Sequence, residues 1–149
     1  MMKPDPRVNK ETADFRRACG IAGEDAAARL LQKKGFRILE RNLHVKKKEI
    51  DIIAESKDFL VFVEVKARTV PYLDEKGNSP FALTPAMAVN RQKQKFVYSA
   101  ASQYLLRHPT SKQPRIDVIE VYLREIPNTY PQAFELLRIH HIENAFGVC

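Results

Sequence analysis

The sequence has little cysteine, and its two cysteines, Cys19 and Cys149, form no recognisable pattern. They show neither the spacing of metal ligands nor a partner pattern for disulfides, which is typical of a cytoplasmic protein. No stretch approaches the roughly 20 apolar residues that a membrane helix needs. The basic residues 1–10 also lack the apolar run of a signal peptide. We therefore expect a cytoplasmic protein with no membrane partner.

Internal repeats and low-complexity tracts are also absent from the sequence, so a repeat architecture is not indicated. The apolar fraction of 44% is enough for one packed core. A length of 149 residues suggests a single domain. We expect residues 1–11 to be a flexible N-terminal segment and residues 12–149 to form that domain.

Acidic residues are outnumbered by basic ones, and the net charge is +7. The excess is uneven, because one window concentrates the basic side chains Arg29, Lys33, Lys34, Arg37, Arg41, His44, Lys46, Lys47 and Lys48. A basic face is the electrostatic signature of a protein that binds a polyanion. A basic surface that is only solvated explains the charge equally well. The interleaved aromatic and basic residues of an RNA-binding sheet are not visible.

The hydrophobic pattern predicts two helices and five strands. The helices are expected at residues 12–34 and 84–107, the second beginning with a capping hydroxyl and a proline, Thr84-Pro85. The strands are expected at residues 38–45, 49–55, 60–67, 115–123 and 133–142. A long loop is expected at residues 69–83. The order α-β-β-β-α-β-β predicts an α/β fold in which a mixed sheet lies between helices.

Two glycines interrupt the first predicted helix. Gly20 and Gly23 each weaken a helix by roughly 1 kcal/mol relative to alanine. Either the helix bends or breaks at these residues, or another segment packs closely against its backbone. The sequence leaves both explanations open.

Charged residues stand inside two apolar strands, in the stretch "KEIDIIAESKDFLVFVEVK". Side chains alternate faces along a strand, so Glu49 and Asp51 share one face, as do Glu64 and Lys66. If "ESKD" is the turn and Glu55 opposes the last residue of that turn, Glu49 lies opposite Glu64, with Asp51 diagonal to it. Every register in which opposed residue numbers have an odd sum puts all four charges on one face.

Like charges that oppose each other in a sheet destabilise it by roughly 0.2–1 kcal/mol per pair. A hard cation such as Mg²⁺ or Mn²⁺ removes this repulsion, because carboxylate oxygens are its preferred ligands. Such a metal can polarise a phosphate and activate a bound water, and Lys66 would orient that water or stabilise the charge. The pattern therefore favours metal-assisted phosphodiester hydrolysis. A solvated sheet face with surface ion pairs is the alternative.

Two further residues are candidates for the same site. Glu24 lies at or near the buried face of the first helix, so it is either a satisfied core carboxylate or a further metal or water ligand. Lys93 shares a helical stripe with Phe96 and Tyr104. Its ammonium either aims toward the sheet or extends along the helix into solvent.

Four other polar residues favour structural roles. Arg115 and Asp117 lie on one face of a predicted strand and could form an ion pair. His140 and His141 have no cysteine or carboxylate at ligand spacing. We interpret both histidines as surface or core residues.

The stretch "GIAGEDAAARLLQKKGFRILERNLHVKKKEIDIIAESKDFLVFVEVKAR" resembles the YraN family of small bacterial proteins. The segments "AVNRQKQKFVYSAASQYL", "RIDVIEV" and "HIENAF" also match that family, so the resemblance covers residues 19–146. It implies a three-layer α/β/α restriction-endonuclease-like fold with a central mixed β-sheet, of the PD-(D/E)xK type.

The resemblance also implies roles for particular residues. The superfamily's aspartate and its E-x-K motif map to Asp51, Glu64 and Lys66. Archaeal Holliday-junction resolvases, which are similar, add a glutamate from the first helix, where this sequence has Glu24. In such proteins the carbonyl of the middle residue, here Val65, completes the metal shell.

Lys93 matches the family's lysine on the following helix. One departure from the superfamily is that Ile50, and not proline, precedes Asp51, as in the family's own E-I-D form. The segment after Arg68 is longer than usual, with "PFAL" where the family more often has phenylalanine-glycine. Nuclease activity is implied by analogy with the superfamily.

These inferences together predict an Mg²⁺- or Mn²⁺-dependent nuclease that acts on DNA, with branched or junction DNA as a possible substrate and a homodimer as a possible assembly. Asp51 and Glu64 would hold the metal, with Glu24 or Glu49 assisting through water. The DNA backbone would be held by Arg29, Lys33, Arg41, Lys46, Lys47, Lys48 and Arg68. One alternative is a nucleic-acid-binding protein that keeps the fold without cutting. Another is a structural or interaction protein with an ion-paired sheet face.

Overall fold

The protein is described from a computed structural model, which defines residues 6–77 and 91–146, with the side chains of the first helix from residue 13 onward. The elements are α1 (Pro6–Lys33), β1 (Arg37–Val45), β2 (Lys48–Glu55), β3 (Phe59–Thr69), α2 (Arg91–Arg107), β4 (Gln113–Ile126) and β5 (Ala133–Ile142). Their order is the predicted one. No helix in these two ranges is long and apolar enough to cross a membrane.

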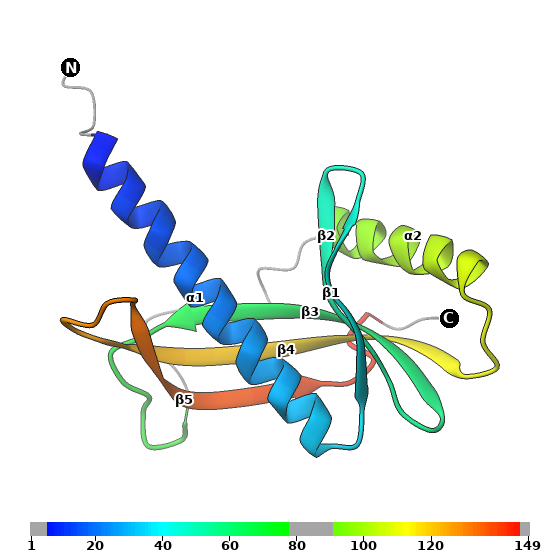
Figure 1. The fold of residues 1–149 in the computed structure, drawn as a ribbon. Coiled ribbons are helices and arrows are strands. Elements are labelled where there is room, and N and C mark those ends of the chain that lie inside the picture. Colours follow the sequence, from blue (N-terminus) through cyan, green and yellow to red (C-terminus); the bar gives the residue numbers. More distant parts are fainter. Residues whose placement is uncertain (1–5, 78–90, 147–149) are drawn as a thin grey trace.

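The five strands form one mixed sheet in the order β1-β2-β3-β4-β5 (Figure 1). Only the pair β3–β4 is parallel, because α2 carries the chain back between these two strands. Val61 and Val63 pack with α1 on one face, and Phe62 packs with α2 on the other. The predicted α/β fold is confirmed, and its helices cover opposite faces of the sheet in a three-layer arrangement.

The first helix differs from the prediction at its N-terminal end, and the start of the second is not tested. The first helix begins at Pro6, so it includes residues 6–11 of the segment that we expected to be flexible. The second helix is described from Arg91 to Arg107, and its end agrees with the prediction. The predicted start at Thr84-Pro85 and the loop residues 78–83 lie outside the described residues.

The two glycines of α1 have different surroundings. A Cβ atom on Gly23 would lie 2.5 Å from Ala67 Cβ, so the helix packs directly against β3 at this point. A Cβ atom on Gly20 would meet nothing within 4 Å. Close packing therefore explains Gly23, and α1 continues through both residues without a break.

In the β2–β3 hairpin each side chain lies on the predicted face of the sheet, but the two strands pair in a different register. Glu55 pairs with Leu60 and Ile52 pairs with Val63, so the assumed pairing of Glu49 with Glu64 is wrong by two residues. The turn lies one residue further along the chain, because Ser56 and Phe59 close it: the Ser56 N–H donates to the Phe59 carbonyl at 2.9 Å, and the Ser56 hydroxyl accepts the Phe59 N–H. A shift of two residues keeps every side chain on its face.

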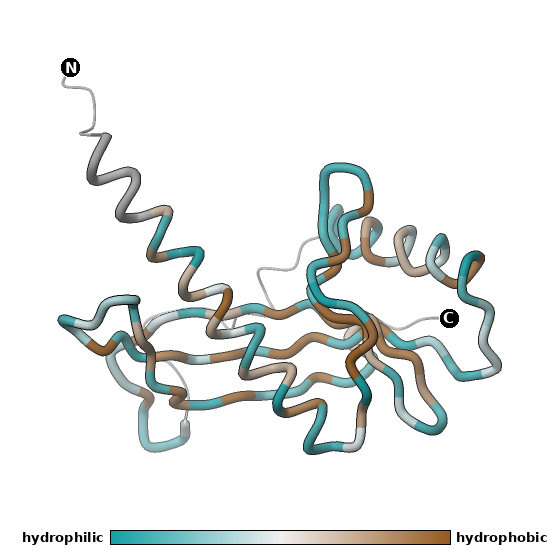
Figure 2. The backbone as a smooth tube through the Cα atoms, in the orientation of Figure 1, coloured by the Kyte–Doolittle hydropathy of each residue, from teal (hydrophilic) through white to brown (hydrophobic). Residues whose placement is uncertain are grey.

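The ladder between β2 and β3 ends at Ile52 and Val63, although both strands continue. Beyond that point β2 stays paired with β1, and these two strands project from the sheet as a hairpin (Figure 1). The tip of the hairpin is hydrophilic, whereas the central strands are mostly hydrophobic (Figure 2). We call the place where β2 and β3 separate the fork.

Candidate active site

Asp51 and Val65 face each other across the fork, one from each strand. The Val65 N–H donates to Asp51 Oδ2 at 2.8 Å, so a carboxylate takes the place of the next ladder bond. In a strand, the N–H and C=O of one residue point to the same edge. The Val65 carbonyl therefore also points into the fork, toward Asp51.

Glu64 lies beside Asp51 and is 4% exposed. Burial raises the pKa of Glu64 to about 7, and the negative charge of Asp51 contributes, although Lys93 and Lys66 oppose the change. Burial also raises the pKa of Asp51, against the opposing effect of the Val65 N–H. The two carboxyl groups lie close enough for each to affect the pKa of the other. Both pKa values are raised, so the fork resists carrying two negative charges.

Two lysines approach the same oxygen of Glu64. Lys66 Nζ and Lys93 Nζ each lie 3.6 Å from Glu64 Oε1. Lys93 also donates to the Glu49 carbonyl at 3.3 Å and lies over the Phe96 ring. Of the two orientations left open for Lys93, the structure has the one toward the sheet.

The other oxygen, Glu64 Oε2, is buried, and no donor reaches it within the described part of the chain. A buried acceptor without a donor costs about 1–3 kcal/mol, so its presence needs an explanation. A hard cation would satisfy it, together with Asp51 and the Val65 carbonyl. In residues 6–77 and 91–146 no three His, Cys, Asp or Glu side chains form a group that could hold a metal ion. The oxygen donors would thus be two carboxylates, one carbonyl and water.

Glu24 and Glu49 lie at the margin of the fork. Burial raises the pKa of Glu24, its hydrogen bond with Asn42 lowers it, and the charges of Asp51 and Glu49 raise it further. Glu24 is therefore close enough to act through water. The Glu49 carboxylate lies 3.3 Å from His44 Nε2 on the hairpin, and its charge also acts on Glu24.

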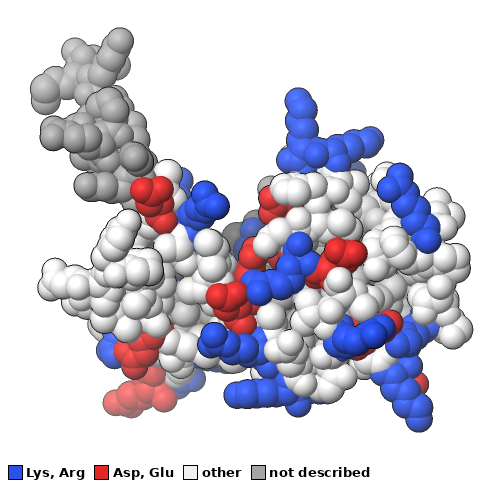
Figure 3. Space-filling view, viewed as in Figure 1, with Lys and Arg blue, Asp and Glu red and all other residues white. Residues whose placement is uncertain are grey.

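The structure separates the basic residues that the sequence grouped together. Lys46 and Lys47 form the hairpin turn and Lys48 begins β2, and Figure 3 shows basic side chains projecting from this tip. Arg29 and Lys33 lie instead on α1, where they border a hollow with residues of β4 and β5.

The two remaining predicted DNA-binding arginines lie nearer the fork. Arg41 pairs with Asp25 at 2.8 Å and lies 3.9 Å from Glu24. Arg68 follows Lys66 on the same face of β3 and stands beside Tyr122 of β4. The hairpin tip, Arg41 and Arg68 thus surround the fork, and Arg29 and Lys33 do not.

A second polar cluster was only partly anticipated. The expected ion pair of Arg115 with Asp117 is present and bidentate, with both distances 2.9 Å. His141 Nε2 also lies 2.7 Å from Asp117 Oδ2, and Lys34 Nζ lies 2.9 Å from His141 Nδ1. Because an ammonium only donates, Nδ1 accepts and Nε2–H donates to Asp117.

His140 similarly meets the buried Glu120 at 3.0 Å. Both histidines therefore find their carboxylates on the neighbouring strand β4. Local sequence spacing carries no signal for such contacts, because the paired residues of these two antiparallel strands lie 20 and 24 positions apart in the sequence.

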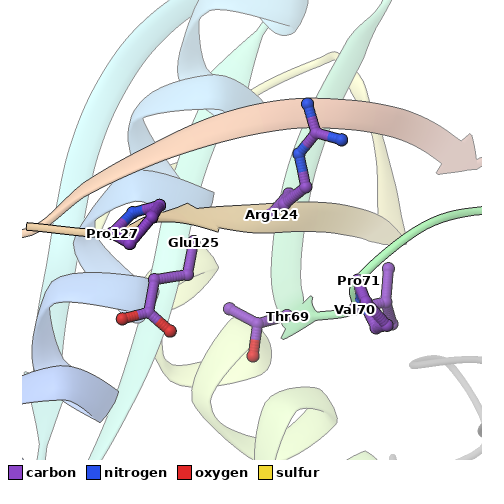
Figure 4. Close-up of a pocket in the computed structure, with 6 residues that line it drawn as sticks. All are labelled: Thr69, Val70, Pro71, Arg124, Glu125 and Pro127. Atoms are coloured by element: carbon purple, nitrogen blue, oxygen red, sulfur yellow. The ribbon is translucent and has the colours of Figure 1, made fainter.

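Another hollow lies elsewhere, and its described lining lacks this chemistry. It measures about 530 Å³ and lies where β3 and β4 end. Figure 4 shows Arg124 and Glu125 pointing to opposite sides of β4, and Arg124 pairs with Glu135 of β5. This hollow therefore has no converging charged groups, and the fork remains the candidate site.

Comparison with known proteins identifies the family. A model of the uncharacterised protein family UPF0102 matches residues 23–121. A UPF0102 protein of Caldanaerobacter subterraneus subsp. tengcongensis is 40% identical over 141 residues, which cover 94% of this chain and 98% of the relative. A UPF0102 protein of Clostridioides difficile is 40% identical over 139 residues, covering 93% and 98%. The chain belongs to UPF0102, the YraN-like family that its sequence motifs resemble.

Proposed function

We propose that the protein is an Mg²⁺- or Mn²⁺-dependent nuclease that hydrolyses phosphodiester bonds in DNA. The observation that carries this proposal is the carboxylate pair of the fork. The half-buried Asp51 lies beside the buried Glu64, and Glu64 Oε2 has no donor in the described part of the chain. A hydrogen-bonded or ion-paired structural site would leave no such oxygen.

The metal would be held by Asp51, Glu64 and the Val65 carbonyl, with Glu24 reaching it through water. When bound, such a metal polarises a phosphate and activates water. The pKa of Glu64, about 7, means that this carboxyl is half protonated near neutral pH. Glu64 must release that proton before it can act as a ligand.

Lys66 and Lys93 supply the positive charges of the site. Both ammonium groups lie 3.6 Å from Glu64 Oε1, beside the two carboxyl groups of the fork. If Glu64 turns to a metal, these groups are free to donate to phosphate oxygens or to orient the attacking water. Lys93 is held in place by the Glu49 carbonyl, whereas Lys66 is 31% exposed and can reach a substrate.

DNA would be held mainly by its phosphates. The tip of the β1–β2 hairpin carries projecting basic side chains (Figure 3). Arg68 stands on the same strand as Glu64. Phosphate contacts carry no sequence code, so recognition would depend on DNA shape more than on base sequence. Branched DNA is the substrate form that we would test first.

The test is cleavage of branched, flapped, single-stranded and plain duplex DNA with Mg²⁺, with Mn²⁺ and with EDTA. We expect cleavage only with metal, and a loss of at least about 100-fold in Asp51→Asn and in Lys66→Ala. The amide of the Asp51→Asn side chain keeps an oxygen that can accept the Val65 N–H, so the fold is retained. Asp58→Asn and Lys57→Ala, which change exposed residues of the β2–β3 turn, are matched controls and should cut normally.

Cleavage that persists in EDTA or in Asp51→Asn would contradict the proposed site. Equal DNA binding and no cleavage by the wild type and both variants would favour a binding protein that keeps the fold without the reaction.

A further inference from the structure

A groove of about 510 Å³ runs between α1 and β3 and begins at the fork. Its floor is largely apolar and consists of Phe15, Cys19, Gly20 and Ala67. The Phe15 ring is fixed by an edge-to-face contact with Phe134 at 5.6 Å. Burial raises the pKa of the Cys19 thiol, so the floor carries no charge at neutral pH.

Gly20 keeps this groove open. Glycine is costly inside a helix, and Gly23 is explained by its contact with Ala67, but among the described residues no atom would lie within 4 Å of a Cβ on Gly20. The space next to Gly20 is the groove itself. A glycine in place of a stronger helix former at the wall of an open groove allows a ligand to approach the helix backbone closely.

The rim of the groove is cationic. Arg16 of α1 and Arg68 of β3 stand at its sides, with Lys66 at the end near the fork. Within the described ranges, neither arginine has an ion-pair partner, unlike Arg41, which is held by Asp25. Glu24 is the acidic residue of the lining and lies at the fork end. The groove therefore presents unpaired positive charge to an anion, except where it meets the candidate site.

The floor also includes an open strand edge. Val65 directs its N–H to the β2 side, so Ala67, two residues further, directs its own N–H and C=O to the same edge. The β2–β3 ladder has already ended at Val63, so β2 does not pair with this part of β3. Backbone amides at an open edge are suitable donors to phosphate oxygens.

We propose that this groove binds a single-stranded segment of nucleic acid and leads it into the fork, which names the substrate form for the nuclease proposed above and rests on that proposal. An aromatic and apolar floor with a cationic rim is the combination that binds single strands, because bases stack below while phosphates are held above. A duplex keeps its bases paired inside and cannot lay them on Phe15 or Gly20. The favoured substrates are therefore flaps, overhangs and branched DNA with unpaired nucleotides at the cut.

Binding is measured by fluorescence anisotropy in EDTA, so cleavage does not enter the result. The probes are one labelled 12-nucleotide strand, its blunt duplex, and the same duplex with a single-stranded overhang. We expect the strand and the overhang duplex to bind more tightly than the blunt duplex. Arg68→Gln and Arg16→Gln should each weaken binding of the single strand about fivefold and lower its log–log salt slope by about 0.7. Arg17→Gln, an exposed neighbour outside the groove, is the matched control and should change neither more than twofold.

Gly20 provides a second, steric test. Gly20→Leu fills the groove and should weaken single-strand binding at least about tenfold, as loss of a stacked base does. Gly20→Ala adds one methyl group and should have a smaller effect. Both substitutions improve helix propensity, so the melting temperature should not fall and a binding loss cannot reflect unfolding.

Unchanged single-strand binding in Gly20→Leu and Arg68→Gln, or equal losses for the strand and the blunt duplex, would overturn the groove proposal. If that happens while metal-dependent cleavage is still lost in Asp51→Asn, the nuclease proposal stands alone. If the variants lose single-strand binding as expected but the wild type cuts no substrate, the groove stands and the nuclease proposal fails.

Discussion

Asp117 on β4 and Glu64 on β3 are both buried acids of the same sheet, but their oxygens meet different partners. Asp117 accepts two hydrogen bonds from Arg115, one from His141 and one from the Asn144 backbone, at 2.7–2.9 Å. Glu64 has two lysines at 3.6 Å from one oxygen, and no donor in the described chain reaches the other. Both acids are buried, but only Asp117 has hydrogen-bond donors for both of its oxygens.

The pKa values follow this difference. Burial raises the pKa of Asp117, but the hydrogen bonds from His141, Arg115 and Asn144 outweigh it, and the net change is downward. For Glu64 the burial effect prevails, and the pKa rises to about 7. Asp117 therefore stabilises the fold by anchoring the segment that follows β5. Glu64 adds a cost that a cation would relieve, which is the property expected of a functional group.

The largest effect should come from breaking the satisfied site. Asp117→Asn places an amide where four donors converge and removes the counter-charge nearest to Arg115, which keeps only the more distant Glu143 at 3.8 Å. We expect the free energy of unfolding to fall by about 3–5 kcal/mol, measured by urea denaturation.

The matched control for this prediction is Asp58→Asn, an exposed residue, which should stay within about 0.5 kcal/mol of wild type. A loss below about 1 kcal/mol in Asp117→Asn would mean that the cluster does not anchor the fold.

Glu64 should show the opposite behaviour, as a dependence on pH. Its folded pKa of about 7 lies above the ordinary 4.5, so the native state holds the proton more tightly between these values. The associated stability is present below pH 4.5 and is lost as pH rises through 7, a fall of at most roughly 3 kcal/mol. Urea titrations of the metal-free protein at pH 5 and pH 8.5 measure it. Glu64→Gln, which cannot ionise, should flatten this profile and be the more stable protein at pH 8.5.

Asp117 is the internal control for the direction in which stability changes with pH. Its folded pKa is lowered, so its contribution is present above pH 3.8 and is lost only as acid protonates it. If the metal-free wild type became more stable from pH 5 to pH 8.5, the predicted effect of Glu64 on stability would have the wrong sign.

Metal should change the unsatisfied site and leave the satisfied one unaffected. At pH 8.5, Mn²⁺ at about 100 times its dissociation constant should add about 2.7 kcal/mol to the free energy of unfolding. The gain should vanish in Glu64→Gln, and at pH 5 a proton on Glu64 should weaken binding. Calorimetric titration gives the dissociation constant, and thermal melting gives the stability. The same gain in Glu64→Gln would mean that the ion binds elsewhere.

Sequence patterns predicted the strands and the shared face of the fork but not its register. The hydrophobic pattern predicted β5 at the residues observed. The alternation of side chains between the two faces of the hairpin predicted that Asp51, Glu64 and Lys66 lie together. The turn is closed by Ser56 and Phe59, one residue beyond the assumed position, and this moved the register by two residues, a side-chain effect that strand patterns do not contain. Glu49 consequently pairs with His44 on the hairpin and not with Glu64.

The cluster at Asp117 shows the other limit. Its ion pair with Arg115 is local, two residues apart on one strand, and was predicted. His141 and Asn144 reach Asp117 from another strand and from the chain beyond it, so only the folded sheet brings them together. The distinction between a satisfied and an unsatisfied acid depends on such long-range donors. Sequence alone could propose that Glu64 and Asp117 are buried, but not which of them lacks partners.

The smallest effects should come from the lysine beside each acid. Lys34→Met removes a hydrogen bond to His141 at the surface, while Asp117 keeps all four of its own. We expect a loss of less than about 1 kcal/mol. Lys66→Met removes a charge that lowers the pKa of Glu64, so that pKa should rise further. Its cost, also about 1 kcal/mol, should therefore be absent at pH 5, where Glu64 is protonated, and present at pH 8.5. A Lys66→Met cost that is the same at pH 5 and pH 8.5, measured by urea denaturation, would show that Glu64 does not titrate between these two values.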